Sequence, residues 1–185
     1  MSVFCSSSLQ TQNDLLLNKL TDFYKNVHYL ETMMRIINGE TKISLRIVDW
    51  FVTNYAKKYY TVYELPIIRS NVESFIRFKV YNDYKLKLKA YSKKRFDPFC
   101  RWERITIPFK EKHMETTIGQ LNFFKWAIES NVIEYIENNY ALIEADMNSR
   151  NTSSKKREAI DNNDNSKTRK KREELSVSAV KCIKK

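Results

Sequence analysis

The chain has very little glycine and proline: Gly39 and Gly119 are its two glycines, and three residues of 185 are proline. A phosphate-binding loop of the P-loop or dinucleotide-binding type needs several glycines within a few residues. That class of nucleotide site is therefore excluded. The scarcity of both residues also disfavours loop-rich or solenoid folds with many tight turns.

Cysteine and histidine are scarce as well. Cys5, Cys100 and Cys182 are widely separated and form no CxxC pair, which argues against a disulfide framework and favours a reducing compartment. His28 and His113 add too few ligands for a zinc site. Nothing in the spacing of Cys100 and His113 supports a catalytic dyad. We therefore expect no metal, no cofactor and no enzymatic activity.

Long apolar runs are missing too. No stretch approaches the roughly 18 apolar residues that a membrane-spanning helix needs. Residues 1–11 have neither a charged start nor an apolar stretch long enough for a signal peptide, so none is expected. With 42% apolar and 13% aromatic residues, the chain supports a core without disulfides.

Composition changes sharply near residue 148. Beyond it the aromatic residues vanish and Asn, Ser, Lys and Arg dominate. Such a stretch buries too little apolar surface to offset the entropy lost on ordering. The sequence therefore predicts a flexible N-terminus (1–11), a single mixed helix/strand domain (12–148) and a disordered basic tail (149–185).

The net charge of +11 is unevenly distributed. Residues 77–112 hold twelve Lys or Arg against four Asp or Glu, while residues 113–148 hold one against six. The tail holds twelve against five. This layout suits an anionic partner such as nucleic acid, a membrane surface or an acidic protein. The acidic block docking on the basic one, in the same or another copy, is an alternative that stays open.

Hydrophobic periodicity predicts an α+β fold, a small antiparallel sheet flanked by helices. Phe123, Phe124 and Trp126 are expected in the core. The predicted elements are helices over 14–25, 29–37, 44–58 and 82–94, strands over 59–68, 74–80 and 103–109, and a helical stretch over 120–147 interrupted at Asn131.

Local capping signals support these helices. Asn13, Ser44 and Thr117 are expected N-caps, and Gln120 lies three residues after Thr117 as in a capping box. The Asn38-Gly39 pair predicts a helix end. The segment 44–58 also has strand-like alternation at its start, but a strand would point Asp49 inward, so a helix is favoured.

The basic segment is the first candidate site. Lysines on an exposed helix and nearby arginines neutralise phosphates and make binding salt-dependent. The predicted nucleic-acid-binding residues are Lys85, Lys87, Lys89, Lys93, Lys94, Arg95, Arg101 and Arg104. Tyr81, Tyr84 and Tyr91 lie among them and either stack on bases or, as is more common, belong to the core.

The tail carries two further basic clusters, Lys155-Lys156-Arg157 and a second one that contains Arg169, Lys170, Lys171 and Arg172. Three interpretations stay open: an electrostatic arm for nucleic acid, a bipartite nuclear import signal, and an inert solubilising tail.

Two other classes of function are weighed against nucleic-acid binding. A structural or assembly adaptor would use the acidic helices of residues 120–147 and the aromatic motifs, and would expose an apolar patch around Trp50, Phe99, Trp102 or Trp126. An enzyme of unfamiliar type would need Asp49, Asn54, Asp97 and Arg101 to converge in a polar cleft. For Asp49, capping or pairing with Arg46 is the commoner explanation.

Three stretches stand out as signatures: Ser44–Tyr55 (SLRIVDWFVTNY), Phe96–Arg101 (FDPFCR) and Thr116–Trp126 (TTIGQLNFFKW). In these the chain resembles a family of uncharacterised proteins encoded by nucleocytoplasmic large DNA viruses, the giant viruses, over about residues 10–148. That resemblance implies a viral protein of the host cytoplasm or viral factory or of the virion, with nuclear import through the basic tail as a further expectation. It assigns no activity. Nucleic acid is the expected partner and a viral protein the alternative.

Overall fold

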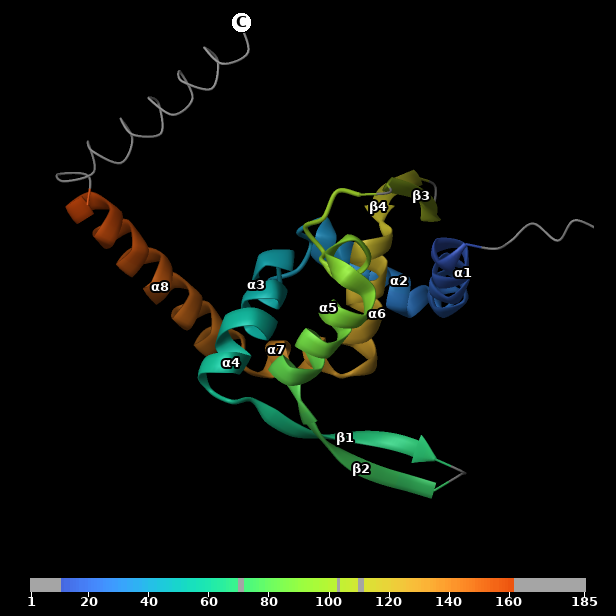
Figure 1. Cartoon of the computed structure of the whole chain (residues 1–185), viewed down its shortest axis with the longest axis horizontal. Helices are drawn as coiled ribbons and strands as arrows, with labels where there is room; N and C mark the ends of the chain where they lie inside the picture. Colours follow the sequence, from blue (N-terminus) through green and yellow to red (C-terminus); the bar gives the residue numbers. More distant parts are fainter. Residues whose placement is uncertain (1–10, 70–71, 103, 110–111, 162–185) are drawn as a thin grey trace, which may run out of the picture. The chain divides into compact units, whose positions relative to one another are not determined.

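The computed structural model describes residues 11–69, 72–102, 104–109 and 112–161, and Figure 1 labels their helices and strands. These residues fall into two units that divide after Ile143. The first unit contains α1 to α7 and the first residues of α8, and the second contains the rest of α8.

The first unit combines helices with antiparallel strands, which confirms the predicted α+β class. In chain order its elements are α1 (Gln12–Tyr24), α2 (Val27–Ile37), α3 (Leu45–Trp50), a π-helical stretch (Phe51–Tyr55), α4 (Ala56–Lys58), β1 (Val62–Arg69), β2 (Val72–Lys79), α5 (Val80–Phe96), β3 (Arg104–Phe109), β4 (Lys112–Thr117), α6 (Ile118–Glu129), α7 (Val132–Asn138) and α8 (Tyr140–Asp161).

The strands form two separate hairpins rather than the one small sheet that the sequence predicts. β1 pairs with β2, with Val62 opposite Lys79, and β3 pairs with β4, with Arg104 opposite Thr117. Each strand pairs with its nearest neighbour in the chain, which keeps the entropy of loop closure low. Figure 1 shows β1–β2 extending away from the helices.

Most of the predicted helix starts are confirmed. Ser44 Oγ accepts a hydrogen bond from Ile47 N at 3.3 Å, and Thr117 Oγ1 accepts one from Gln120 N at 3.1 Å. The cap of α1 is different from the prediction, because Thr11 rather than Asn13 forms a capping box with Asp14. Thr11 gains two reciprocal bonds in this way, which an Asn13 cap would not provide.

Helix α6 lies at the centre of the core. It packs against α1, α2, α5, α7 and β4. Phe123 and Phe124 are fully buried and Trp126 nearly so, as predicted. Asn131, at φ 53°, interrupts the helical stretch between α6 and α7 at the predicted residue.

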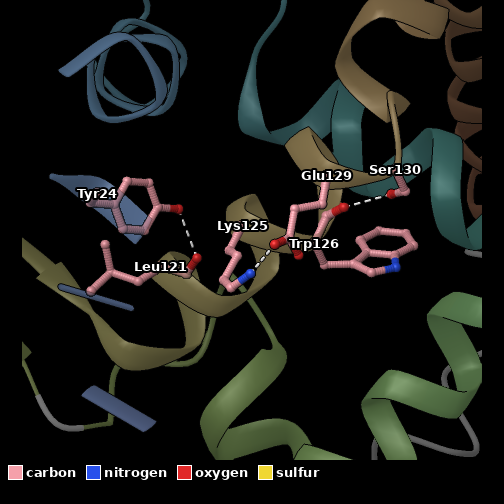
Figure 2. Close-up of polar contacts among 6 residues, drawn as sticks. All are labelled: Tyr24, Leu121, Lys125, Trp126, Glu129 and Ser130. Atoms are coloured by element: carbon pink, nitrogen blue, oxygen red, sulfur yellow. Dashed lines mark hydrogen bonds and ion pairs between the residues drawn. The ribbon is translucent and has the colours of Figure 1, made fainter. Parts of the chain in front are cut away.

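Figure 2 shows one polar contact between α1 and α6 and two within the α6 segment. Tyr24 Oη on α1 donates to Leu121 O at 2.8 Å, and Ser130 Oγ donates to Trp126 O at 2.5 Å. Lys125 and Glu129 form an ion pair on the same helix. Burial raises the pKa of Tyr24 well above its usual value, so the phenol stays a hydrogen-bond donor at all ordinary pH values.

Helix α8 extends through residues 149–161, a range for which the sequence predicts disorder. Lysine and arginine are good helix formers, and adding one residue to an existing helix costs little. The tail residues beyond 161, with the cluster of Arg169, Lys170, Lys171 and Arg172, lie outside the described residues, and for them disorder stays a prediction.

Candidate nucleic-acid interface

Helix α5 carries most of the predicted basic residues, and one of its faces is fixed by the core. Val80 and Tyr84 are buried on that face, and Phe96 at the end of the helix is buried as well. The Phe96 ring packs edge-to-face on Phe123, with the ring centroids 5.8 Å apart. Trp126 Nε1 on α6 donates to Asp83 Oδ1 at 2.6 Å. The opposite face of α5 must therefore point to solvent.

The structure separates the six predicted basic residues of α5 into two groups. Lys85, Lys89, Lys93 and Lys94 are exposed, whereas Lys87 and Arg95 are half-buried. Residues four apart lie on one side of a helix, which explains why Lys85 and Lys89 share the exposed face.

Arg95 has a structural role in this conformation. Its Nε donates to Asn13 Oδ1 at 2.6 Å and its Nη1 to Gln12 Oε1 at 3.4 Å. Both acceptors are on α1. Arg95 therefore joins the end of α5 to α1. Two of its N–H donors are bonded to protein oxygens, which leaves fewer donors for a ligand.

The backbone of α5 is kinked at Ser92, which has φ 65° and ψ 165°. That region is populated almost entirely by glycine, and a serine there stores strain. The kink separates the face that bears Lys85 and Lys89 from the turn that bears Lys93 and Lys94.

The tyrosines of this segment are mainly structural. Tyr84 is buried, and Tyr91 stacks on Phe96 with ring centroids 6.0 Å apart. Tyr81 is half-buried beneath the Lys57 ammonium. The exposed ring near the basic residues is that of Phe99, which is 53% exposed. In the sequence, the position of Phe99 in the FDPFCR motif, two residues before Arg101, is the feature that indicates a site residue.

Two of the sequence signatures, FDPFCR and TTIGQLNFFKW, meet in space. A Cβ on Gly119 would lie 2.7 Å from Asp97 O, so only glycine allows α6 to approach this turn so closely. Asn122 Nδ2 donates to Arg95 O at 2.8 Å. The turn itself is held by Asp97, whose Oδ1 accepts from Phe99 N at 2.9 Å.

A cavity of about 430 Å³ lies where these motifs meet, and we call it the motif pocket. Its lining residues are Leu45, Pro98, Phe99, Cys100, Arg101, Arg104, Glu115, Thr116, Thr117 and Gln120. Arg101 and Arg104 are both exposed at this pocket, so two of the predicted basic residues converge there. Arg104 Nη1 lies 3.2 Å from Glu115 Oε2 in a solvent-exposed ion pair.

The hydroxyl and amide groups that line the pocket bond to each other. Thr116 Oγ1 donates to Gln120 Oε1 at 3.0 Å, and Thr117 Oγ1 caps α6. The predicted capping box is thus half formed: Gln120 contacts Thr116 instead of the backbone of Thr117. The guanidinium groups of Arg101 and Arg104 are the charged donors that the pocket offers to a ligand.

Asp49 and Asp97 lie within electrostatic reach of one another. Burial, with the Asp97 carboxylate as a second cause, raises the pKa of Asp49 to about 6. Burial, followed by the Asp49 and Asp97 carboxylates, raises the pKa of Tyr84 to about 12. Arg46, the predicted partner of Asp49, is not among the causes of the Asp49 shift.

The four residues weighed for catalysis do not all reach one pocket. Arg101 lines the motif pocket, and neither Asp49 nor Asp97 does. Asn54 Nδ2 donates to Thr53 Oγ1 at 2.9 Å.

Among the residues that the structure describes, no group of three His, Cys, Asp or Glu side chains is placed to hold a metal ion. Likewise, none of the described helices is long and apolar enough to cross a membrane.

The acidic helices border a second cavity, of about 530 Å³, between α2 and the α6–α7 junction. Glu129, Glu134 and Glu137 line it together with His28 and Arg35, and we call it the acidic cavity.

The aromatic patch predicted for an adaptor is mostly absent: Trp126 is buried, Trp50 and Trp102 are half-buried, and Phe99 alone of that set is exposed. The Trp102 ring lies 5.0 Å from Lys94 Nζ.

The predicted residues of the tail have no described side chains. Lys155, Lys156 and Arg157 fall within α8, and the second cluster lies beyond residue 161. The interpretations of the tail therefore stay predictions.

These features define an α+β protein with exposed lysines on α5 and a pocket that is lined in part by two arginines. Residues 7–184 match the family of unknown function DUF7197, and the chain belongs to that family. It is also 44% identical over 139 residues to the uncharacterised protein L507 of Acanthamoeba polyphaga mimivirus, a match that covers 71% of this chain and 52% of L507. The chain thus spans about half the length of that relative. The predicted resemblance to an uncharacterised giant-virus family is confirmed, and no solved structure matches.

Proposed function

We propose that this protein of an uncharacterised viral family is a non-enzymatic nucleic-acid-associated protein. The observation that supports this function is a set of exposed cationic side chains close together in the chain. Lys85, Lys89, Lys93 and Lys94 on α5 are followed by Arg101 and Arg104 at the motif pocket. The basic C-terminal tail acts as an auxiliary arm.

Several exposed cations on one helix suit a phosphate backbone, which carries many negative charges, better than they suit a single small anion. Each phosphate that a lysine neutralises releases condensed counterions, which gives a steep dependence of affinity on salt. The main chain of the helix is already ordered, so binding needs little reordering of the backbone that carries the lysines. The half-buried Lys87 and the bonded Arg95 are expected to contribute less than the four exposed lysines.

Charge reversal tests this proposal. We expect the triple variant Lys85→Glu, Lys89→Glu and Lys93→Glu to bind DNA and RNA at least tenfold more weakly than the unchanged chain. The slope of log affinity against log salt should fall by about 3, one unit for each lost phosphate contact. Fluorescence anisotropy with labelled oligonucleotides at several salt concentrations measures both.

The matched control reverses three exposed lysines away from α5, Lys19→Glu, Lys25→Glu and Lys42→Glu. Both variants then have the same net charge, so a general charge effect weakens both equally. Equal losses in the two variants, or no loss in the first, would exclude α5 as the binding face.

The acidic cavity favours a second candidate, an assembly adaptor that takes a basic protein segment at Glu129, Glu134 and Glu137. A pull-down from infected cells with and without nuclease separates the two functions. Association through nucleic acid is lost on nuclease treatment, whereas a direct protein partner stays bound. For the proposed function we expect the protein in the viral factory or virion.

A further inference from the structure

We propose that the motif pocket binds one unpaired nucleotide of a single strand, with its phosphate on Arg101 and Arg104 and its base on Phe99. This inference rests on the proposed function, because it names the form of nucleic acid that the basic face holds. It assigns a specific ligand to a pocket built from two of the sequence signatures.

Phe99 is the first observation that carries the inference. A phenylalanine that is 53% exposed leaves apolar surface in water, and here it forms part of a cavity wall. The hydrogen bond from Phe99 N to Asp97 Oδ1 and that from Cys100 N to Asp97 O, at 3.1 Å, fix the backbone that carries the ring. A ring on an ordered backbone loses less entropy when a base stacks on it than a ring on a flexible segment would. Base–aromatic stacking on such a platform tolerates every base.

The two arginines are the second observation. Guanidinium groups form planar forks that match phosphate oxygens. Arg104 is already paired with Glu115, with side chains 59% and 69% exposed. Exposed pairs of this kind contribute only about 0–1 kcal/mol, so a phosphate that also contacts Arg101 displaces the carboxylate.

The shape of the site selects single strands. In a duplex each base face is covered by its neighbours and cannot reach a ring inside a concave wall unless the base is unstacked or flipped out. A volume of about 430 Å³ falls within the range of small-ligand clefts and is far too small for a double helix. Lys93 and Lys94 precede the pocket in the chain by a few residues, so neighbouring phosphates of the strand meet the exposed lysines of α5.

The test measures the affinity of the full-length protein for oligo-dT and oligo-U of about 12 nucleotides, and for a duplex of equal length. We expect Phe99→Ala to weaken binding of both single strands about tenfold or more, and to leave duplex binding unchanged. Phe99→Trp should retain single-strand binding, since a tryptophan ring also stacks on a base. Arg101→Ala with Arg104→Ala should weaken single-strand binding and reduce its salt slope. Comparing oligo-dT with oligo-U shows which strand the site prefers.

Phe75→Ala is the matched control, because Phe75 on β2 is 66% exposed and far from the pocket in sequence. Both phenylalanines are on the surface, so neither change should affect folding, which a thermal melt checks. Cys100, a half-buried free thiol in the same pocket, gives a second readout: bound oligo-dT should slow its alkylation in the unchanged protein and not in Phe99→Ala.

The possible failures are distinguishable. If the unchanged protein binds neither single strands nor duplex, the proposed function and this inference both fall. If it binds but Phe99→Ala and the double arginine variant bind as tightly, the function survives and the pocket assignment is wrong. If Phe99→Ala weakens duplex and single strands equally, or no more than Phe75→Ala does, the pocket does not recognise an unpaired base.

Discussion

At the scale of single residues, the absence of a side chain is as informative as its presence. Gly119 is in helix α6, where replacing glycine by alanine ordinarily stabilises by about 1 kcal/mol. Here the added Cβ would meet Asp97 O at 2.7 Å and Lys94 O at 3.3 Å, both backbone atoms that cannot swing aside. The close approach that forms the motif pocket thus depends on one missing methyl group.

Gly119→Ala should therefore destabilise the protein, by about 1–3 kcal/mol, as expected for overpacking. Urea denaturation monitored by tryptophan fluorescence measures the change. Helix propensity alone predicts that Gly119→Ala stabilises the protein, so the sign of the change in unfolding free energy distinguishes the two effects. An alanine variant that is more stable would show that α6 and the Asp97 turn are not in close contact.

Asp49 gives a prediction with a pH dependence. Its pKa, raised to about 6 in the folded protein from 3.8, means that the folded state binds the proton more tightly than the unfolded chain. Stability contributed by the protonated form is therefore full below pH 4 and falls as the pH rises through 6. Because Asp49 is partly exposed, the loss is discounted for solvent screening to about 1 kcal/mol.

Asp49→Asn should accordingly stabilise the protein at pH 7.5 by about 1 kcal/mol and have little effect at pH 4. Denaturant midpoints at the two pH values test this. Destabilisation at both values would mean that the ionised carboxylate has a favourable partner, as the predicted pairing with Arg46 would provide.

At the scale of elements, buried stripes and two of the three expected N-caps, Ser44 and Thr117, could be predicted from the sequence. Ser44, Thr117 and Asn131 act locally, so their roles follow from the residues around them. β4 could not be predicted in this way. Its residues Lys112–Thr117 lack alternating apolar side chains, and the strand exists because β3 pairs with it.

The basic residues of α5 show the same limit for the candidate site. Lysines at this spacing predict a charged helix, but the sequence cannot show that Arg95 reaches Asn13, which is distant in the chain. Nor can it show that Phe99 stays exposed while Phe96, in the same motif, is buried. Long-range packing decides both, and it leaves no local signal.

The kink at Ser92 is a testable property of α5. Glycine adopts φ 65°, ψ 165° without the penalty that serine incurs there, so Ser92→Gly should stabilise the protein by about 1 kcal/mol. Ala90→Gly is the control, since Ala90 lies on the same helix with ordinary helical geometry and should lose about 1 kcal/mol. Thermal or urea unfolding of both variants measures the difference. Similar losses in the two would show that α5 is continuous through Ser92.

At the scale of the whole molecule, positive charge is present in two places, the α5 face and the C-terminal tail. A purely electrostatic arm needs no defined geometry, whereas the α5 face is fixed by the packing of Tyr84 and Phe96 on α6. In the proposed function, lysines on an ordered helix next to a shaped pocket would distinguish one form of nucleic acid from another, which charge alone would not. We therefore assign recognition to the domain and added affinity to the tail.

One comparison tests this assignment most directly: the affinity for single-stranded DNA of two full-length variants with equal net charge. One has Lys85→Glu, Lys89→Glu and Lys93→Glu, and the other has Lys170→Glu, Lys171→Glu and Arg172→Glu. Recognition by the domain predicts that the first loses affinity tenfold or more and that the second loses much less. A larger loss in the tail variant, or equal losses in both, would contradict it.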